Sequence, residues 1–201
     1  MKEQDHDRLL RIKTEGIREW QYQSSHYNRY EATPYIALES LFDAYTCKST
    51  DRFVDFGCGK GRFPFYVHHH LRVSVTGVEM SGPLYQEAMD NLGRYTEKAK
   101  TSRASIRFEL CFAEKYVIDS LENRFYFFNP FSIQVFQKVV SNILLSADNH
   151  PRSVDIILYY PTLEYIQFLE VNTGFELLQE VRVPGLYDQN NNERFLIFRC
   201  E

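Results

Sequence analysis

Residues 52–62, with the sequence RFVDFGCGKGR, limit the possible folds of this chain more than any other stretch. The run Arg52–Phe56 is short and apolar, and it predicts a buried strand. Gly57, Gly59 and Gly61 follow it, and glycines at these positions let the backbone turn sharply and let a ligand approach closely. A helix that begins after such a turn directs free N–H groups toward an electronegative ligand. The stretch therefore predicts an α/β fold with a ligand site at the end of its first strand.

Short β-rich runs alternate with helical patterns over residues 49–201, as in parallel sheets with crossover helices. Further strands are predicted at residues 73–78, 106–111, 125–129 and 154–160. Helices are predicted at residues 83–100 and 114–121, after a capping serine at 132, and from a capping threonine at 162 to about Gly174. Two closing runs, residues 175–183 and 194–199, flank a polar loop and predict an antiparallel hairpin.

Residues 1–48 belong to no β/α repeat and are predicted to form a helical extension in front of a ligand-binding domain at 49–201, within one compact domain. Helices are expected at 3–21 and 34–46, the second with Thr33 as its capping residue and Pro34 in its first turn. Because α/β sheets bind ligands beyond the carboxyl ends of their strands, the extension is a candidate lid over that edge. The alternative is that it only covers the side of the sheet.

The composition is that of an ordinary globular protein, with 44% hydrophobic and 25% charged residues. No apolar run approaches the roughly 18–20 residues that span a bilayer, and the first residues lack the apolar core of a signal peptide. Four cysteines are scattered without a C-x-x-C pair, which favours free thiols in a reducing, cytoplasmic compartment. No spaced set of histidines, acids and cysteines points to a metal, and His68–His70 are expected to be solvated residues at a helix end.

Two acids flank the glycine turn in a way that points to a specific ligand. Asp55 stands two residues before the first glycine, where it can accept a hydrogen bond from a ligand ammonium or order the loop. Glu79 follows the strand VSVTGV, about 20 residues past the loop, where an acid accepts hydrogen bonds from ribose hydroxyls. The alternative role for Glu79 is to cap the next helix. The G-x-G-x-G spacing differs from the G-x-G-x-x-G of dinucleotide binders, and Arg62-Phe63 does not supply the Lys-Ser/Thr of a phosphate loop.

The segments VDFGCGKGR, VTGVEM and FFNPF resemble the first, second and fourth motifs of the class I S-adenosylmethionine (SAM)-dependent methyltransferases. The resemblance extends from about Phe53 to the C-terminus. It implies a Rossmann-like, mostly parallel sheet of seven strands with the last strand antiparallel, helices on both faces, and SAM as the cofactor. It places the methionine part of SAM at Gly57–Gly61 and the ribose at Glu79. The cofactor-binding residues that it implies are Asp55, Gly57, Cys58, Gly59, Gly61, Glu79, Met80, Ala113, Glu114 and Asn129.

The sequence departs from the family after the third strand. Many members carry there an acid followed by a small residue, near the adenine, whereas this chain has Phe112 at the position of the acid. The backbone N–H of Ala113 and the carboxylate of Glu114, one position later, are the expected substitutes.

The end of the fourth strand, FFNPF, resembles the Asn-Pro-Pro-aromatic signature of methyltransferases that modify planar nitrogens, with one proline missing. The resemblance implies that Asn129, Pro130 and Phe131 are catalytic. The Asn129 side chain and a nearby carbonyl would accept hydrogen bonds from an N–H₂ group, and Phe131 would stack on the acceptor. Such orientation supplies much of the rate of a methyl transfer. The alternative is that Asn129-Pro130 is only a strand-ending turn, with Phe131 in the core.

Tyrosines are the candidates for lining the acceptor pocket, since their rings stack on bases and attract cations. The candidate substrate-binding residues are Tyr27, Tyr30, Tyr35 and Tyr160, and the alternative for each is a core or rim position.

The sequence thus favours a SAM-dependent methyltransferase that acts on a nitrogen of a protein side chain, a nucleobase or a small molecule. The net charge of −4 lowers the expectation of nucleic acid. The alternatives are a noncatalytic SAM-binding protein and an oxidoreductase that binds NAD or FAD. The expected partner is an acceptor molecule, with no membrane and no metal.

Overall fold

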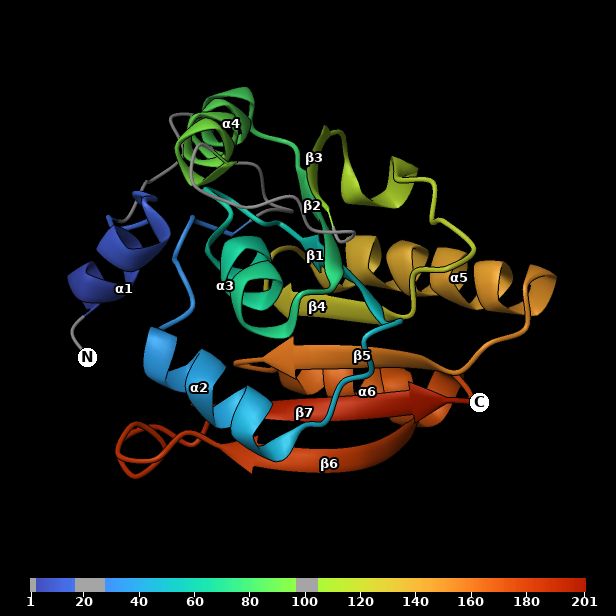
Figure 1. The fold of residues 1–201 in the computed structure, drawn as a ribbon. Helices are drawn as coiled ribbons and strands as arrows, with labels where there is room; N and C mark the ends of the chain where they lie inside the picture. Colours follow the sequence, from blue (N-terminus) through green and yellow to red (C-terminus); the bar gives the residue numbers. More distant parts are fainter. Residues whose placement is uncertain (1–2, 17–27, 97–104) are drawn as a thin grey trace.

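The protein is described by a computed structural model that covers residues 3–16, 28–96 and 105–201 (Figure 1). Its seven strands form one sheet in the order β3-β2-β1-β4-β5-β7-β6. The strands are β1 (Arg52–Phe56), β2 (Ser74–Glu79), β3 (Ile106–Leu110), β4 (Arg124–Phe128), β5 (Val154–Tyr159), β6 (Glu176–Arg182) and β7 (Arg194–Cys200). Only β7 is antiparallel to its neighbours, β5 and β6, so the predicted mostly parallel sheet with an antiparallel last strand is confirmed.

Helices cover both faces of this sheet (Figure 1). The helices are α1 (Glu3–Leu10), α2 (Tyr35–Ala44), α3 (Arg62–Leu71), α4 (Gly82–Thr96), the short 3₁₀ helix η1 (Ala113–Lys115), α5 (Ile133–Asn149) and α6 (Leu163–Asn172). Residues of α2, α3 and α4 share one core cluster with one face of the sheet, and residues of η1, α5 and α6 share a second cluster with the other face.

The central strand β4 shows why its sequence is apolar throughout. Phe125 and Phe127 point into the α5–α6 cluster, while Tyr126 between them points into the α2–α4 cluster. The Phe127 ring stacks on Phe56 of β1 at 5.1 Å, and the Tyr126 ring stacks on Phe63 of α3 at 3.8 Å. Successive side chains of a strand point to opposite faces, so a strand buried on both faces has no polar alternation.

Strand register brings the predicted ligand elements to one edge of the sheet. Phe56 at the end of β1 is paired with Val78 of β2 on one side and with Phe127 of β4 on the other. Gly57 directly follows Phe56, Glu79 directly follows Val78, and Asn129 stands two residues after Phe127. The carboxyl ends of three parallel strands therefore meet at one place, where such sheets bind ligands.

The N-terminal extension differs from its prediction in two respects. The described part of the helix expected at residues 3–21 ends at Leu10, because Arg11 has a φ of 57° and residues 12–15 are not helical. Thr33 does not cap α2. Pro34 occupies the N-cap position without a side-chain hydrogen bond, and the Thr33 hydroxyl instead shares a hydrogen bond of 2.7 Å with the hydroxyl of Tyr126.

Two of the later helices also differ from the predicted limits. Residues 114–121 form only the single turn η1. Helix α6 ends at Asn172, before Gly174, whereas its predicted cap is confirmed, since the Thr162 side chain accepts a hydrogen bond from the Tyr165 N–H. Of the three histidines at the end of α3, His68 is buried and hydrogen-bonded to the Tyr95 hydroxyl rather than solvated.

Candidate active site

The loop after β1 is held against the end of β2 by backbone hydrogen bonds. The N–H groups of Gly57 and Cys58 both donate to the carbonyl oxygen of Val78, at 2.9 and 3.1 Å. Gly57, Gly59 and Gly61 have φ values of 80°, 55° and 88°, a region that other residues rarely adopt. At Gly61 a Cβ would also lie 2.7 Å from the Phe108 ring. The loop therefore needs glycine at all three positions for conformation and at Gly61 for packing.

Glu79 is the buried acid that braces this loop. Its side chain accepts a hydrogen bond from the Gly59 N–H at 2.9 Å and another from the Ser81 N–H at 2.8 Å. Burial raises the pKa of Glu79, and the backbone N–H groups around it partly offset that rise. A carboxylate has about four lone-pair positions, and the backbone N–H groups of Gly59, Ser81 and Met80 bond to this one, so one position remains for a ligand.

Asp55 lies beneath the same loop and is 4% exposed. Burial, together with the nearby charge of Glu79, raises the pKa of Asp55 well above its usual value. Two neighbouring buried acids disfavour each other's ionisation, and a bound cation relieves that repulsion. The pair Asp55 and Glu79 therefore favours a ligand that carries positive charge.

A cavity of about 50 Å³ lies over the carboxyl ends of β1, β2 and β4. It is lined by Asn28, Arg29, Tyr30, Glu31, Gly57, Val78, Glu79, Met80, Leu84, Cys111, Ala113, Phe128, Pro130 and Phe131. The lining combines the glycine loop, the acid after it, the turn after β3 and the turn after β4. This is the crevice that the sequence predicted as the ligand site.

Residues 28–31, which we call the strap, close one side of this cavity. The Tyr30 ring lies against the glycine loop so closely that a Cβ at Gly59 would lie 2.1 Å from it. The Tyr30 hydroxyl donates to the carbonyl of Thr14 at 2.7 Å. Asn28 donates its backbone N–H to the Pro130 carbonyl at 3.0 Å and its side-chain amide to the Asn129 carbonyl at 2.7 Å. The strap therefore connects the N-terminal extension to the turn after β4.

Lys60, in the middle of the glycine motif, points away from the cavity and binds the extension. Its ammonium donates to the carbonyl of Glu15 at 2.9 Å, lies 3.2 Å from a carboxylate oxygen of Glu87, and lies 5.2 Å from the centre of the Tyr30 ring.

Arg62, the residue after the last glycine, makes a second and more deeply buried anchor. Its Nε donates to the Thr14 hydroxyl at 2.7 Å, and one terminal nitrogen binds both the carboxylate of Glu3 and the carbonyl of Thr33. The guanidinium also lies over the Tyr35 ring at 4.4 Å and 3.9 Å from Asp7. The glycine motif thus fixes residues 3–16 through its charged side chains.

The structure brings most of the expected cofactor residues together. Gly57, Glu79, Met80 and Ala113 line the cavity. Asp55, Cys58, Gly59 and Gly61 do not line it but form or support the loop, and Cys58 is buried, with its sulfur facing the position of a Cβ at Gly77.

The expectation for Glu114 is wrong in its placement. Cys111 and Ala113 line the cavity, whereas Glu114, in the 3₁₀ turn at Ala113–Lys115, does not. Phe112, which replaces the family's acid, is 52% exposed and also lies outside the lining.

The three residues after β4 have different environments. Asn129 adopts a φ of 41°, which is unusual for a residue with a side chain, and its carbonyl is directed to Asn28. Pro130 lines the cavity. Phe131 also contributes to the lining but is 2% exposed, packs in the α5–α6 cluster, and has its carbonyl bonded to the Tyr165 hydroxyl.

Of the four candidate tyrosines, Tyr30 alone is described at the cavity. Tyr35 lies in the core, bonded to Asp7 and stacked on His6, so its assignment to the acceptor pocket is wrong. Tyr160 is not in the lining, and its hydroxyl accepts a hydrogen bond from Asn190 at 2.7 Å. Tyr27 lies outside the described residues.

Sequence reasoning missed the strap residue Asn28 and the anchors Lys60 and Arg62. Asn28 stands in a polar, tyrosine-rich segment that carries no periodic signal. In the sequence, the charged residues of the glycine motif indicate only that the motif is not a phosphate loop. A buried role for a charged side chain depends on partners that are distant in sequence.

In residues 3–16, 28–96 and 105–201, no group of three or more histidines, cysteines and acids is arranged to hold a metal ion. Over the same part of the chain, no helix is both long and apolar enough to cross a bilayer.

No protein-family model and no curated protein matches this sequence. Solved structures do match the fold. A SAM-dependent methyltransferase from Thiobacillus denitrificans, in complex with S-adenosylhomocysteine, aligns with 15% identity and a TM-score of 0.52 over 83% of this chain and 90% of that one. An RNA methyltransferase from Salinibacter ruber, also in complex with S-adenosylhomocysteine, aligns with 14% identity and a TM-score of 0.55 over 85% and 92%.

The 4+2 cyclase SpnF matches as well, with 13% identity and a TM-score of 0.54 over 82% of this chain and 79% of that one. One fold therefore occurs in proteins described by different reactions, and the fold alone does not assign a reaction. The strand order, the antiparallel β7 and these likenesses agree: the chain has the Rossmann-like fold of the class I SAM-dependent methyltransferases.

Proposed function

We propose that the protein binds SAM in the cavity and transfers its methyl group to a nitrogen acceptor. The observation that carries the proposal is the bracing of Gly59 by Glu79 at the carboxyl edge of the sheet. It combines a glycine loop whose backbone a ligand can approach with a buried acid that keeps a free acceptor position. The structural likeness to two methyltransferases crystallised with S-adenosylhomocysteine supports the same conclusion.

The chemistry of the lining suits this cofactor. Glu79 would hold the ribose hydroxyls, and Asp55, beneath the loop, would favour a cationic ligand, since burial and then the nearby charge of Glu79 raise its pKa. Met80, Leu84 and Ala113 offer apolar surface to a flat ring. SAM, when bound, supplies a methyl group on a positively charged sulfur.

The proposal of a nitrogen acceptor is supported by the turn after β4. The carbonyls of Asn129 and Pro130 both accept hydrogen bonds from N–H groups at the cavity. An acceptor that donates two N–H groups to this turn is thereby oriented with its lone pair free. Methyl transfer needs this orientation more than it needs acid–base help, since in-line placement supplies much of the rate.

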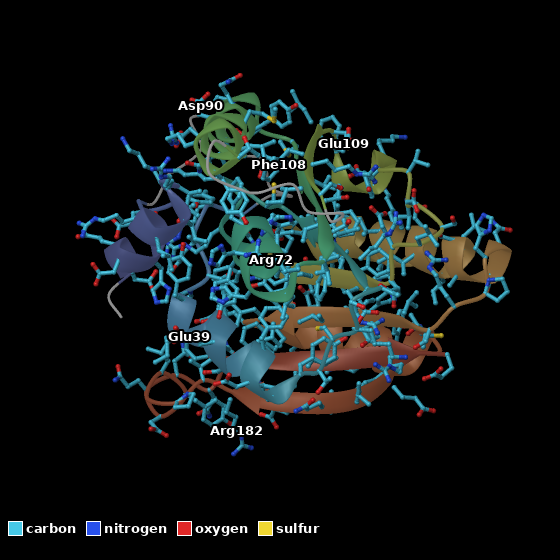
Figure 2. All side chains as sticks on the ribbon, viewed as in Figure 1. Glu39, Arg72, Asp90, Phe108, Glu109 and Arg182 are labelled. Carbon is cyan, nitrogen blue, oxygen red and sulfur yellow. The ribbon has the colours of Figure 1, made fainter. Side chains whose placement is uncertain are left out.

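Calorimetric titration with S-adenosylhomocysteine, the reaction product, tests the cofactor site. We expect micromolar binding that Glu79→Gln weakens at least tenfold, or about 1.4 kcal/mol, because the amide nitrogen of Gln turns a donor toward a backbone N–H. Glu109→Gln is the matched control, since Glu109 lies exposed on the neighbouring strand β3 (Figure 2). Binding of NAD instead of S-adenosylhomocysteine would contradict the proposal and favour the oxidoreductase alternative.

The second candidate is a SAM-binding protein that transfers no methyl group. The specific observations that favour it are the burial of Phe131 and the occupation of the Asn129 and Pro130 carbonyls by Asn28. It predicts that S-adenosylhomocysteine binds but that labelled SAM methylates nothing in a panel of amines, nucleobases and peptides. A labelled product whose formation falls in Asn129→Ala would support the methyltransferase.

A further inference from the structure

The strap leaves little room in the cavity. Sites for cofactors and drug-sized ligands have volumes of roughly 300–1,000 Å³, whereas this cavity, which is partly open to solvent, has a volume of about 50 Å³. That space holds a few water molecules, since one water needs roughly 10–15 Å³ of such volume. The side chains that fill the remainder include Tyr30, which is 7% exposed and lies against Gly59.

The strap also occupies the carbonyls after β4 with the chemistry of an acceptor. Asn28 presents two N–H donors, one from its backbone and one from its primary carboxamide. They reach the consecutive carbonyls of Pro130 and Asn129 at 3.0 and 2.7 Å, which are ordinary hydrogen-bond lengths. The unusual φ of Asn129 directs its carbonyl toward this partner.

We infer that the strap is a displaceable plug in which Asn28 stands in for the methyl acceptor. In this closed state Asn28 holds the two carbonyls that otherwise receive the acceptor, and Tyr30 covers the glycine loop. The inference rests on the proposed function and adds the acceptor's chemical class to it. The acceptor is a molecule that offers two N–H donors to the turn after β4, as Asn28 does from its backbone and its side chain.

The contacts of the strap fit a segment that leaves without unfolding the domain. Asn28 and Arg29 are exposed, and the Arg29 guanidinium pairs only at 3.5 Å with Glu31, within the strap. The strap is held to the body by the bonds of Asn28 with the β4 turn, by the bond of the Tyr30 hydroxyl with Thr14, by a backbone bridge at Tyr30 and by the Lys60 ammonium over the Tyr30 ring. Thr14 is itself hydrogen-bonded to Arg62, so we expect Thr14 to stay in place when the strap opens.

A plug lowers the apparent affinity for the cofactor by the fraction of molecules that are open. Weakening the plug therefore tightens binding, whereas weakening a lid that closes over the ligand loosens it. This difference in sign separates the two roles of the extension.

The test is calorimetry with S-adenosylhomocysteine on the full chain and on Asn28→Ala, with Asn149→Ala as control. Asn149 is an exposed asparagine at the far end of α5 from the cavity. We expect Asn28→Ala to lower the dissociation constant at least fivefold and Asn149→Ala to leave it unchanged. Tyr30→Ala, the second variant, is expected to lower the dissociation constant as well.

Hydrogen exchange gives a readout that is independent of activity. The Asn28 amide is bonded to Pro130 in the closed state, so we expect S-adenosylhomocysteine to speed exchange of a peptide that covers residues 28–34. Slower exchange on binding, or a dissociation constant that Asn28→Ala leaves equal or raises, overturns the plug and leaves the proposed function intact. Failure of every variant to bind S-adenosylhomocysteine overturns both, and binding by Asn28→Ala alone supports both.

Discussion

At the scale of single residues, the site places two acids where the free protein gains nothing from their charge. Asp55 and Glu79 are both 4% exposed, and burial raises the pKa of each. Groups that destabilise the unliganded fold are common at functional sites, where stability and activity are opposed. The cost is recovered when a cationic ligand binds.

Asp55→Asn is expected to stabilise the unliganded protein at neutral pH. When the pKa of a carboxyl is higher in the folded state than in the unfolded state, the protein loses stability as the pH rises from the unfolded pKa, near 3.9, to the folded pKa. The neutral amide avoids that loss, so the variant's melting temperature is expected to exceed the wild type's above about pH 4. Below that pH the difference should disappear.

Thermal unfolding at several pH values measures this difference. Calorimetry with S-adenosylhomocysteine measures the effect of the same substitution on ligand binding. Asp55→Asn removes a negative charge beneath the loop that would favour a cationic ligand, so we expect binding about tenfold weaker, or 1.4 kcal/mol. A variant that melts at or below the wild-type temperature at neutral pH would show that Asp55 stabilises the loop in its ionised form.

At the scale of elements, α3 has a second role besides covering the sheet. Its first residue, Arg62, binds Glu3 of α1, Thr14 and the Thr33 carbonyl before α2, so it connects three separate segments. The element that follows the glycine loop is therefore also the support for the extension. The loop and the extension respond together to a change at this residue.

Arg62→Leu is expected to destabilise the fold strongly. Removing the guanidinium leaves the buried Asp7 without its cation, and breaking a buried ion pair costs about 3–5 kcal/mol. At about 2–4 °C per kcal/mol for a domain of this size, the melting temperature falls by roughly 6–20 °C. Arg152→Leu is a control of the same chemistry, since within the described part of the chain Arg152 hydrogen-bonds only to backbone carbonyls and a serine hydroxyl. An equal fall in melting temperature in both variants would mean that Arg62 contributes no more to stability than Arg152 does.

At the scale of the whole molecule, the candidate site joins segments that lie between residues 28 and 131. The cavity is lined by residues of the strap, the glycine loop, and the turns after β2, β3 and β4. A ligand that fills it therefore stabilises the entire fold rather than one element. Binding to the folded state alone raises stability by mass action.

S-adenosylhomocysteine at 100 times its dissociation constant is expected to add about 2.7 kcal/mol of stability. With about 2–4 °C per kcal/mol, the melting temperature should rise by roughly 5–11 °C. NAD at the same concentration is the control and should leave it unchanged. The absence of any shift with S-adenosylhomocysteine would contradict a SAM site in this cavity.

The sequence by itself determined the sheet, the glycine loop and the position of Glu79. Runs such as RFVDF and VDIILYY are local signals, because strands buried on both faces are apolar throughout, and glycine spacing reports backbone conformation directly. Only the tertiary structure decided the rest. Tyr30 and Tyr35 stand only five residues apart, yet Tyr35 lies in the core and Tyr30 lies against Gly59. The roles of Asn28, Lys60 and Arg62 were decided in the same way, because a polar side chain is defined by partners that folding brings from elsewhere in the chain.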